Sequence, residues 1–123
     1  MSDKQEYVSN DLSIHVDGEG ETINVLWLGK STERTPGRFI SPILQSVLDQ
    51  ASGAGKRVVL DFRKLGYMNS STVTPLIHFL EMARRSQCQI SIMYDKSARW
   101  QDLSFSALRV FVTQDNRIRI EGT

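Results

Sequence analysis

The segment Arg57-Val58-Val59-Leu60-Asp61-Phe62 restricts the fold of this chain more than any other part of the sequence. It is short, rich in β-branched residues and apolar almost without interruption, which is typical of a strand covered on both faces. Such strands lie in sheets on which helices pack. We therefore expect residues 57–62 to be a central strand of an α/β domain.

The periodicity of the flanking segments predicts the rest of the sheet and its helices. Apolar and polar residues alternate in four further segments, the first two of which read as a hairpin around the turn at residues 17–20. Apolar stripes at helical spacing predict two longer helices and one short one, and Pro36 can start an earlier turn before the first. The order predicts an α/β fold with a mixed, mainly parallel sheet of four to six strands and crossover helices on it. The predicted strands are 12–16, 22–28, 57–62, 89–94 and 117–121, and the predicted helices are 42–51, 73–83 and 98–103.

Length and composition fit one domain spanning residues 1–123, with the first ten residues frayed. A chain of 123 residues with 40% hydrophobic residues can bury a core without metal or disulfide support. Trp27 and Trp100 are interpreted as packing residues. The core is predicted to include Leu26, Leu28, Val47, Leu48, Val58, Leu60, Val73, Ile77, Leu80, Ile90 and Ile92.

The charge balance and the cysteine count exclude several function classes. Fifteen Lys and Arg residues against fourteen Asp and Glu residues argue against nucleic acid as a partner, because phosphate neutralisation needs a basic excess. Cys88 is the single cysteine, which excludes an intrachain disulfide and a cysteine-rich zinc site. The polar N-terminus and the absence of a long apolar run predict a cytoplasmic protein that is not bound to a membrane.

The sequence offers no constellation typical of an enzyme. His15 and His78 lie far apart in the chain, and no phosphate-binding glycine motif is present. The glycine-rich residues 52–56 follow a predicted helix, whereas a phosphate-binding loop must follow a strand. We therefore expect a protein that is not an enzyme and that needs neither a metal nor a cofactor.

One segment carries more polar groups than its structure requires: Asn69-Ser70-Ser71-Thr72, between the central strand and the next helix. In open α/β sheets, ligands and partners bind at the carboxyl ends of the strands. Capping a helix needs one such residue, so at least two hydroxyls have no structural reason to be there. If Pro75 occupies the first helical position, Ser70 and Ser71 lie in the preceding loop. Arg63 and Lys64, near the strand's end, are either an anion-attracting pair or a solvated loop pair.

The run Met68-Asn69-Ser70-Ser71-Thr72, placed between a strand with its loop and an apolar helix, resembles the STAS domain of bacterial anti-sigma-factor antagonists. The resemblance extends from the leading strands to residues 103–108. In those proteins the motif reads Asp-Ser-Ser-Gly and a partner kinase phosphorylates its first serine, which implies Ser70 here. Ser71 is the alternative acceptor, expected to be closer to the helix and partly engaged in capping.

Asn69 and Thr72 depart from the antagonist motif at its first and last positions. Together with Leu28–Pro36, Phe39 and Pro42, they are similar to a related group of single-domain STAS-like regulators of bacterial biofilm and stress signalling. In that group the hydroxyl residue after Asn is phosphorylated, and one client is a diguanylate cyclase.

The resemblance implies a phosphorylation-controlled interaction module in a partner-switching pathway. Its partners would be an anti-sigma-like Ser/Thr kinase, a PP2C-type phosphatase and a client protein, with Asn69, Ser70, Ser71, Thr72, Arg63 and Lys64 at the binding surface. The alternative is a sensor that binds a nucleotide or small anion at the same helix N-terminus, where free N–H groups favour negative charge.

Overall fold

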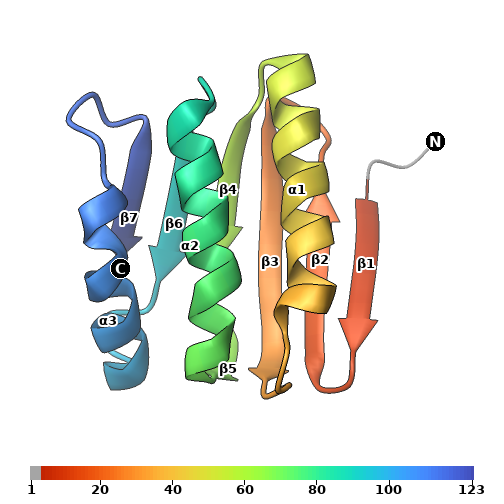
Figure 1. The fold of residues 1–123 in the computed structure, drawn as a ribbon, viewed down its shortest axis with the longest axis vertical. Coiled ribbons are helices and arrows are strands. Elements are labelled where there is room, and N and C mark those ends of the chain that lie inside the picture. Colours follow the sequence, from red (N-terminus) through yellow and green to blue (C-terminus); the bar gives the residue numbers. More distant parts are fainter. Residues whose placement is uncertain (1–3) are drawn as a thin grey trace.

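The computed structural model describes residues 4–123. The chain forms a seven-stranded mixed sheet with helices packed on it (Figure 1), which confirms the predicted α/β class. The strands are β1 Lys4–Ser9, β2 Leu12–Asp17, β3 Thr22–Ser31, β4 Arg57–Asp61, β5 Leu65–Met68, β6 Ile90–Tyr94 and β7 Ile118–Gly122. The helices are α1 Gly37–Ala54, α2 Ser70–Arg85 and α3 Arg99–Ser106, and the 3-10 helix η1 Ala107–Phe111 follows α3.

The sheet has the order β1-β2-β3-β4-β6-β7, with the short strand β5 paired to the end of β3. Strands β1, β2 and β3 are antiparallel, whereas β3, β4, β6 and β7 run parallel to one another. The central position of β4 is as predicted. The predicted maximum of six strands is wrong, because β1 and β5 went unrecognised.

Strand β1 corrects the expectation that the first ten residues fray. Lys4–Ser9 pairs with β2 along its whole length, while residues 1–3 lie outside the described part of the chain. Its mostly exposed, polar residues hide the alternation by which an amphipathic strand is recognised. Strand β5 has only four residues, one of them glycine, which is too little for a periodic signal.

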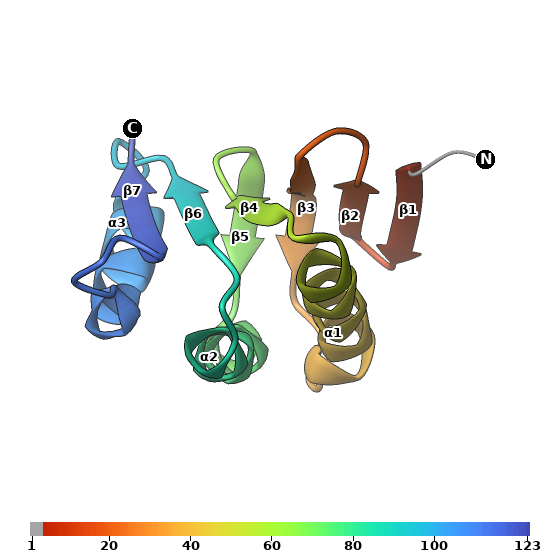
Figure 2. The ribbon, with the colours of Figure 1, turned by 90° about the horizontal axis from the view of Figure 1, so that it is seen from above.

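The molecule has two layers, because α1, α2 and α3 all lie on the same face of the sheet (Figure 2). The expectation that β4 is covered on both faces is therefore wrong. Val58 and Leu60 point towards the helices and are buried, whereas Val59 points to the opposite face and is half-buried. A run of β-branched residues fits a strand between two neighbours as well as one between two helical layers.

The core lies between the sheet and the helices, where Trp27 packs on Phe62 with ring centroids 4.6 Å apart. Val25 and Trp27 occupy the inward positions of β3, so Leu26 and Leu28, predicted to be core residues, lie half-exposed on the open face. Side chains of a strand alternate between its two faces, so a prediction that is off by one residue assigns every side chain to the wrong face. Val73 and Ile77 are only partly buried against the core. The predicted core residues that are buried are Val47, Leu48, Val58, Leu60, Leu80, Ile90 and Ile92.

Helix α1 begins at the earlier turn that Pro36 was expected to allow, whereas α2 begins before its predicted start, and each helix contains a proline after its first turn. Helix α1 starts after Pro36 and contains Pro42, and α2 starts after Asn69 and contains Pro75. Each proline removes one backbone hydrogen bond from a helix that its apolar face holds against the sheet. Helix α1 also runs on to Ala54 and ends at Gly55, whose φ of 66° gives the left-handed conformation of a C-cap.

Candidate functional site

The residues singled out in the sequence lie at the edge of the sheet where the parallel strands end. Helices α1, α2 and α3 all begin at this edge, because each follows a strand that runs towards it (Figure 1). Strand β5 leads directly into Asn69, and α2 starts at Ser70. The structure thus places the polar segment where α/β proteins commonly bind ligands or partners.

Asn69 holds three chain segments together through its side chain and backbone. Its Oδ1 accepts hydrogen bonds from the backbone N–H (3.1 Å) and hydroxyl (2.7 Å) of Thr72, which makes it the N-cap of α2. Its Nδ2 donates to the carbonyl oxygen of Glu33 (2.8 Å), and its backbone N–H donates to that of Ser31 (3.0 Å). Because the carboxamide both accepts and donates, asparagine suits this position better than the aspartate of the antagonist motif.

Thr72 is fully buried and completes this network. Its hydroxyl proton goes to Asn69, so the hydroxyl of Ser31, also buried, donates to Thr72 Oγ1 at 2.7 Å. The chain of hydroxyls joins the end of β3 to the first turn of α2. Thr72, predicted to contact a partner, cannot do so directly and instead fixes the residues around it.

Ser70 and Ser71 are the two hydroxyl residues that this network does not use. They are the first residues of α2, both are exposed, and neither hydroxyl has a hydrogen-bond partner within residues 4–123. Pro75 does not occupy the first helical position, so Ser70 and Ser71 do not lie in a preceding loop. The expected capping role of Ser71 is wrong, because Asn69 caps the helix. Two hydroxyls remain free at the surface, as the excess of polar groups predicts.

The bond from Asn69 to Glu33 leads to a testable prediction. In Asn69→Asp, the cap acceptor stays, but the Nδ2 donor becomes a carboxylate oxygen facing a carbonyl oxygen. We expect the domain to fold with its free energy of unfolding lowered by about 1–3 kcal/mol, the cost of unpairing a partly buried polar group. Urea unfolding measures this. An Asn69→Asp variant as stable as the wild type would show that the Glu33 bond adds nothing.

Arg63 is already neutralised by a carboxylate. Its Nε and Nη2 donate to the two carboxylate oxygens of Asp61 at 3.0 and 2.9 Å, and its backbone N–H donates to the same carboxylate. Lys64 is exposed and forms no ion pair with any described residue. No hydrogen bond joins either residue to Asn69–Thr72 within the described chain. Lys64 is therefore the more available cation of the two.

The Arg63–Asp61 pair predicts a pH dependence of stability. Burial by itself raises the pKa of Asp61, but hydrogen bonds from Arg63 and the charges of Arg63 and Lys64 outweigh it, so the pKa lies below its ordinary value. A carboxyl with a lowered folded-state pKa stabilises the fold above its unfolded pKa, and this stability is lost as the pH falls.

We therefore expect Asp61→Asn to lose less stability than the wild type as the pH is lowered from about 4, near the unfolded pKa of an aspartate. Thermal melts between neutral and strongly acidic pH measure the difference. Parallel losses in the two proteins would contradict this contribution of Asp61.

Exposed apolar side chains near the start of α2 were not recognised as a site from the sequence. Tyr67 on β5 is 45% exposed, and its ring centroid lies 6.2 Å from that of Trp100 on α3. Leu103, one helical turn after Trp100, is 69% exposed. The signal was the spacing of Trp100 and Leu103, which places both on one face of a short helix.

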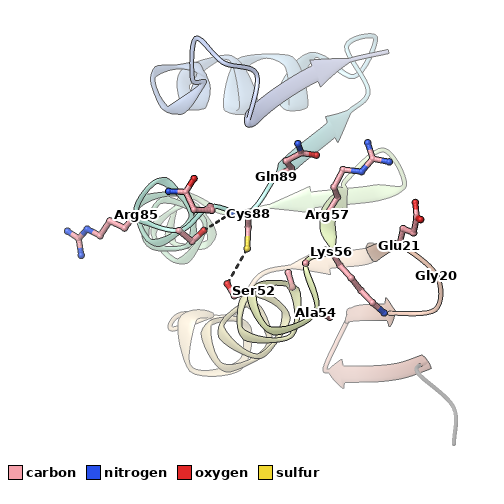
Figure 3. A pocket seen from close by; sticks show the side chains of 13 residues that line it. Gly20, Glu21, Ser52, Ala54, Lys56, Arg57, Arg85, Cys88 and Gln89 are labelled. Carbon is pink, nitrogen blue, oxygen red and sulfur yellow. Dashed lines mark hydrogen bonds between the residues drawn. The ribbon is translucent and has the colours of Figure 1, made fainter.

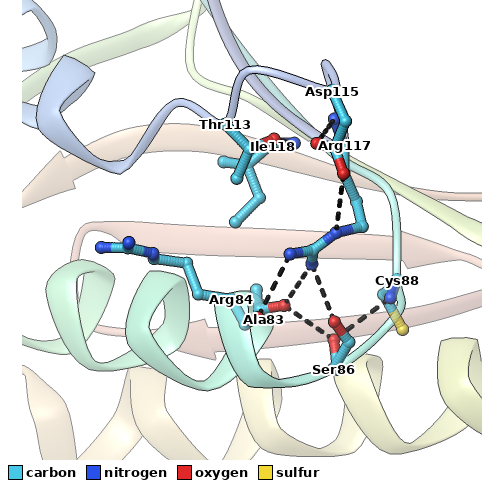
Figure 4. Close-up of polar contacts among 8 residues, drawn as sticks. All are labelled: Ala83, Arg84, Ser86, Cys88, Thr113, Asp115, Arg117 and Ile118. Carbon is cyan, nitrogen blue, oxygen red and sulfur yellow. Dashed lines mark hydrogen bonds and ion pairs between the residues drawn. The ribbon is translucent and has the colours of Figure 1, made fainter.

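Helix α2 is held at its opposite end by Arg117, which comes just before β7 (Figure 4). The Nη1 of Arg117 donates to the carbonyl oxygens of Ala83 (2.9 Å) and Ser86 (2.7 Å), and its Nη2 donates to that of Arg84 (3.2 Å). The last carbonyls of a helix have no N–H partner in a following turn, and Arg117 adds donors there, although Ala83 also accepts from the backbone N–H and the hydroxyl of Ser86. With Asn69 at one end and Arg117 at the other, α2 presents its serines on a fixed support.

A cavity of about 950 Å³ lies at the opposite edge of the sheet (Figure 3). Cys88 is buried beside it, with its sulfur 3.2 Å from the hydroxyl oxygen of Ser52, while Lys56 and Arg85 point in different directions. The cavity is next to the C-terminal ends of α1 and α2, where the helix dipoles disfavour anions. Residues 52–56 therefore do not form a phosphate-binding loop.

Other classes of site find no support in residues 4–123. No cluster of three or more His, Cys, Asp or Glu side chains able to hold a metal ion occurs in this range. No helix there combines the length and apolar character that crossing a membrane requires.

Fold and site together define a two-layer α/β domain with two free serines on a rigid helix start. Comparison with protein-family models gives no match, and no curated protein is significantly similar to the chain in sequence. The function must therefore be argued from the site.

Proposed function

We propose that this protein is a phosphorylation-controlled interaction module of a bacterial partner-switching pathway, with Ser70 as the phosphate acceptor. The unphosphorylated protein binds a client protein, an anti-sigma-like kinase phosphorylates Ser70, and a PP2C-type phosphatase reverses the modification. A diguanylate cyclase is one client that the resemblance of the motif suggests. The protein itself performs no chemistry in this scheme.

The observation that carries the proposal is that two of the four residues in Asn69–Thr72 form the helix cap, while the side chains of the other two stay available at the surface. Asn69 and Thr72 are committed to the capping network, whereas the hydroxyls of Ser70 and Ser71 are exposed and have no hydrogen-bond partner among residues 4–123. A kinase can reach such a hydroxyl without unfolding the helix, and the phosphate would not displace an existing hydrogen bond. The resemblance of the motif selects the first serine of the two.

Phosphate mapping tests the proposal directly. The protein is purified from the cells that produce it, and its phosphopeptides are compared with those of Ser70→Ala and Ser71→Ala expressed in the same cells. We expect phosphate on Ser70 in the wild type and in Ser71→Ala, and none in Ser70→Ala. Phosphate confined to Ser71, Thr72 or Thr74 would contradict the assignment.

An anion sensor at the same helix start is the competing function. The pair Arg63–Asp61 argues against it, because one of the two predicted ligand cations is already neutralised and only Lys64 remains without an ion pair within residues 4–123. Thermal melting against nucleotides and inorganic phosphate separates the two functions. A saturable rise of the melting temperature that Ser70→Ala retains would favour the sensor.

A further inference from the structure

We propose that the outer face of α3 and η1 binds a second copy of this chain, so that two domains pair along antiparallel helices. The face consists of Leu103, Ser106, Ala107 and Val110, all of which are exposed, and we call it the α3–η1 face. The inference goes beyond the proposed function, because it concerns a different surface and depends on no property of Ser70.

The residues of the α3–η1 face lie on one side of the helical segment. Each residue of an α-helix advances by about 100°, so Leu103 and Ala107 point in directions about 40° apart. Side chains three residues apart in a 3-10 helix eclipse one another, so Val110 points the same way as Ala107. Phe105 and Leu108 are buried on the opposite side. The outer side of this segment thus carries apolar groups where a surface helix normally carries polar ones.

No described residue covers this face. Helix α3 packs against β6 and β7 and is the outermost helix of the layer (Figure 2). Leu103 is 69% exposed and Val110 is 77% exposed, the two highest fractions among the large hydrophobic side chains of residues 4–123. Large apolar side chains that are exposed together mark interaction surfaces.

Hydrogen bonds hold the segment firmly on the sheet. The buried Gln101 donates through Nε2 to the carbonyl oxygens of Phe62 (2.7 Å) and Leu65 (3.0 Å). Arg109 donates through Nη1 to the carbonyl oxygen of Ile120 (3.0 Å) in β7. The α3–η1 face is therefore presented in a fixed shape, and its docking loses little conformational entropy.

The order of side-chain sizes along the face fits a second copy of the same face. The larger Leu103 and Val110 stand at its two ends, and the small Ser106 and Ala107 lie between them. A two-fold axis between Ser106 and Ala107 sets Leu103 of each copy against Val110 of the other. The small central residues let the two helices approach to the usual interaxial distance of about 8–10 Å. A two-fold dimer, the commonest oligomer, requires a self-complementary patch of this kind.

The cation at the start of α3 favours the antiparallel arrangement. Arg99 is exposed and forms no ion pair within residues 4–123, whereas the α3–η1 face itself is uncharged. Parallel pairing would bring the two copies of Arg99 side by side. Antiparallel pairing separates them by about 20 Å, since each lies some seven residues from the axis at a rise of about 1.5 Å. Over that distance, more than two Debye lengths of about 8 Å, salt screens the repulsion.

The charges on one flank of the face are complementary under the same axis. Asp102 lies before the axis and Arg109 after it, and both point about 80–100° to the same side of Leu103. In an antiparallel two-fold pair the same flanks meet. Asp102 of each copy therefore lies on the side of Arg109 of the other, and opposite charges face each other.

The interface is small, so the pairing should be weak. The 8 residues of α3 and the 5 residues of η1 give a segment about 22 Å long and about 10–12 Å wide. Its footprint of about 250 Å² per copy is well below the roughly 600–800 Å² per partner of a stable complex. We therefore expect dimers at about 0.1–1 mM protein rather than at nanomolar concentrations.

Sedimentation equilibrium of the unmodified full chain between about 10 μM and 1 mM tests the pairing. We expect the average mass to rise from that of one chain towards that of two. Leu103→Lys and Val110→Glu should each weaken self-association by about tenfold or more, because pairing would bury an uncompensated charge. Val8→Glu on β1 is the matched control, since Val8 is 63% exposed and receives the same change as Val110. It should associate like the wild type, and all three variants should melt near the wild-type temperature.

An equimolar mixture of Leu103→Lys and Val110→Glu tests the antiparallel register. In a mixed pair the introduced lysine of one copy faces the introduced glutamate of the other, while the second contact remains Leu103 against Val110. Association should therefore recover in the mixture but in neither variant alone. Parallel pairing would set each introduced charge against an apolar side chain and give no recovery.

Amide shifts of the wild type, followed by NMR as its concentration rises, locate the contact without any substitution. They should change at residues 103–110. A mass of one chain up to about 1 mM, shifts confined to other elements, equal losses in Val8→Glu and Val110→Glu, or no recovery in the mixture would overturn the proposal. No kinase takes part, so this outcome is independent of whether Ser70 is the phosphate acceptor.

Discussion

Gly29→Ala is expected to lower the free energy of unfolding by about 3 kcal/mol or more, a large share of the roughly 5–15 kcal/mol that stabilises a domain. Gly29 has a φ of +86°, in the left-handed region. A Cβ added there would lie 1.9 Å from the carbonyl oxygen of Asp11, a backbone atom that also accepts a hydrogen bond from the N–H of Lys30. Neither strand can move aside without breaking the β2–β3 pairing.

The effect should reach the site as well as the sheet. Beyond Gly29 the register of β3 shifts, and the strand continues to Ser31, which meets Thr72 and Asn69. Gly66 on β5 packs closely on the other side, since a Cβ there would lie 3.2 Å from the carbonyl oxygen of Gly29. A displaced Gly29 thus shifts the two strand ends that support the start of α2.

Gly20→Ala is the matched control, because Gly20 has a similar φ of +79° but nothing within 4 Å of its added Cβ. It should cost only the strain of the left-handed backbone, about 1–2 kcal/mol. Urea unfolding of the two variants separates the strain from the clash. Equal losses would mean that the close approach to Asp11 is relieved without cost.

Periodicity predicted the α/β class, the position of the central strand and most of the helical core, because each depends on repeated local choices. Periodicity did not predict which face of β3 is buried or where the helices begin, because contacts with other elements decide both. The inward parity of β3 is set by Val25 and Trp27 packing against the helices, and the apolar residues on both sides of Leu26 leave the alternation ambiguous. The start of α2 was missed, and that of α1 was left open between Pro36 and Pro42, because tertiary packing holds Pro42 and Pro75 inside helices that propensity alone would break.

The position of the candidate site could be predicted from the sequence, but the role of each of its residues could not. Counting hydroxyls predicted that some would be free, yet only the structure shows that Asn69 and Thr72 are the committed ones, because their partners Ser31 and Glu33 come from a distant segment. The contact between the rings of Tyr67 and Trp100 was missed for the same reason: the two rings come from different elements, and Gln101 ties α3 to the start of β5.

Phosphorylation of Ser70 is expected to leave the fold nearly unchanged while weakening partner binding by about a thousandfold, which corresponds to ~4 kcal/mol. The phosphate sits on an exposed side chain at the N-terminus of α2 and breaks no hydrogen bond that the structure describes in residues 4–123. The helix dipole stabilises it there by roughly 0.3–1 kcal/mol, so the melting temperature should hardly fall.

Across an interface the same charge acts in the opposite direction. A group carrying about −1.5 to −2 charges must lose water on docking, and a surface that fits the neutral hydroxyl offers no charge to compensate that loss. The partner is first isolated by affinity capture on Ser70→Ala. Calorimetric titration of that partner with the phosphorylated and the unphosphorylated protein then measures the difference in binding. Ser70→Asp should weaken binding less than phosphate, because it adds one charge.

Ser71→Asp is the matched control for the position of the charge. It adds the same charge to the same helical turn, but about 100° further round the helix, because α-helices have about 3.6 residues per turn. It should therefore disturb docking less than Ser70→Asp, while both variants melt near the wild-type temperature. If the phosphorylated protein bound its partner within about tenfold of the unmodified one, a difference of only 1.4 kcal/mol, the charge on Ser70 would be too weak an effect to act as a switch.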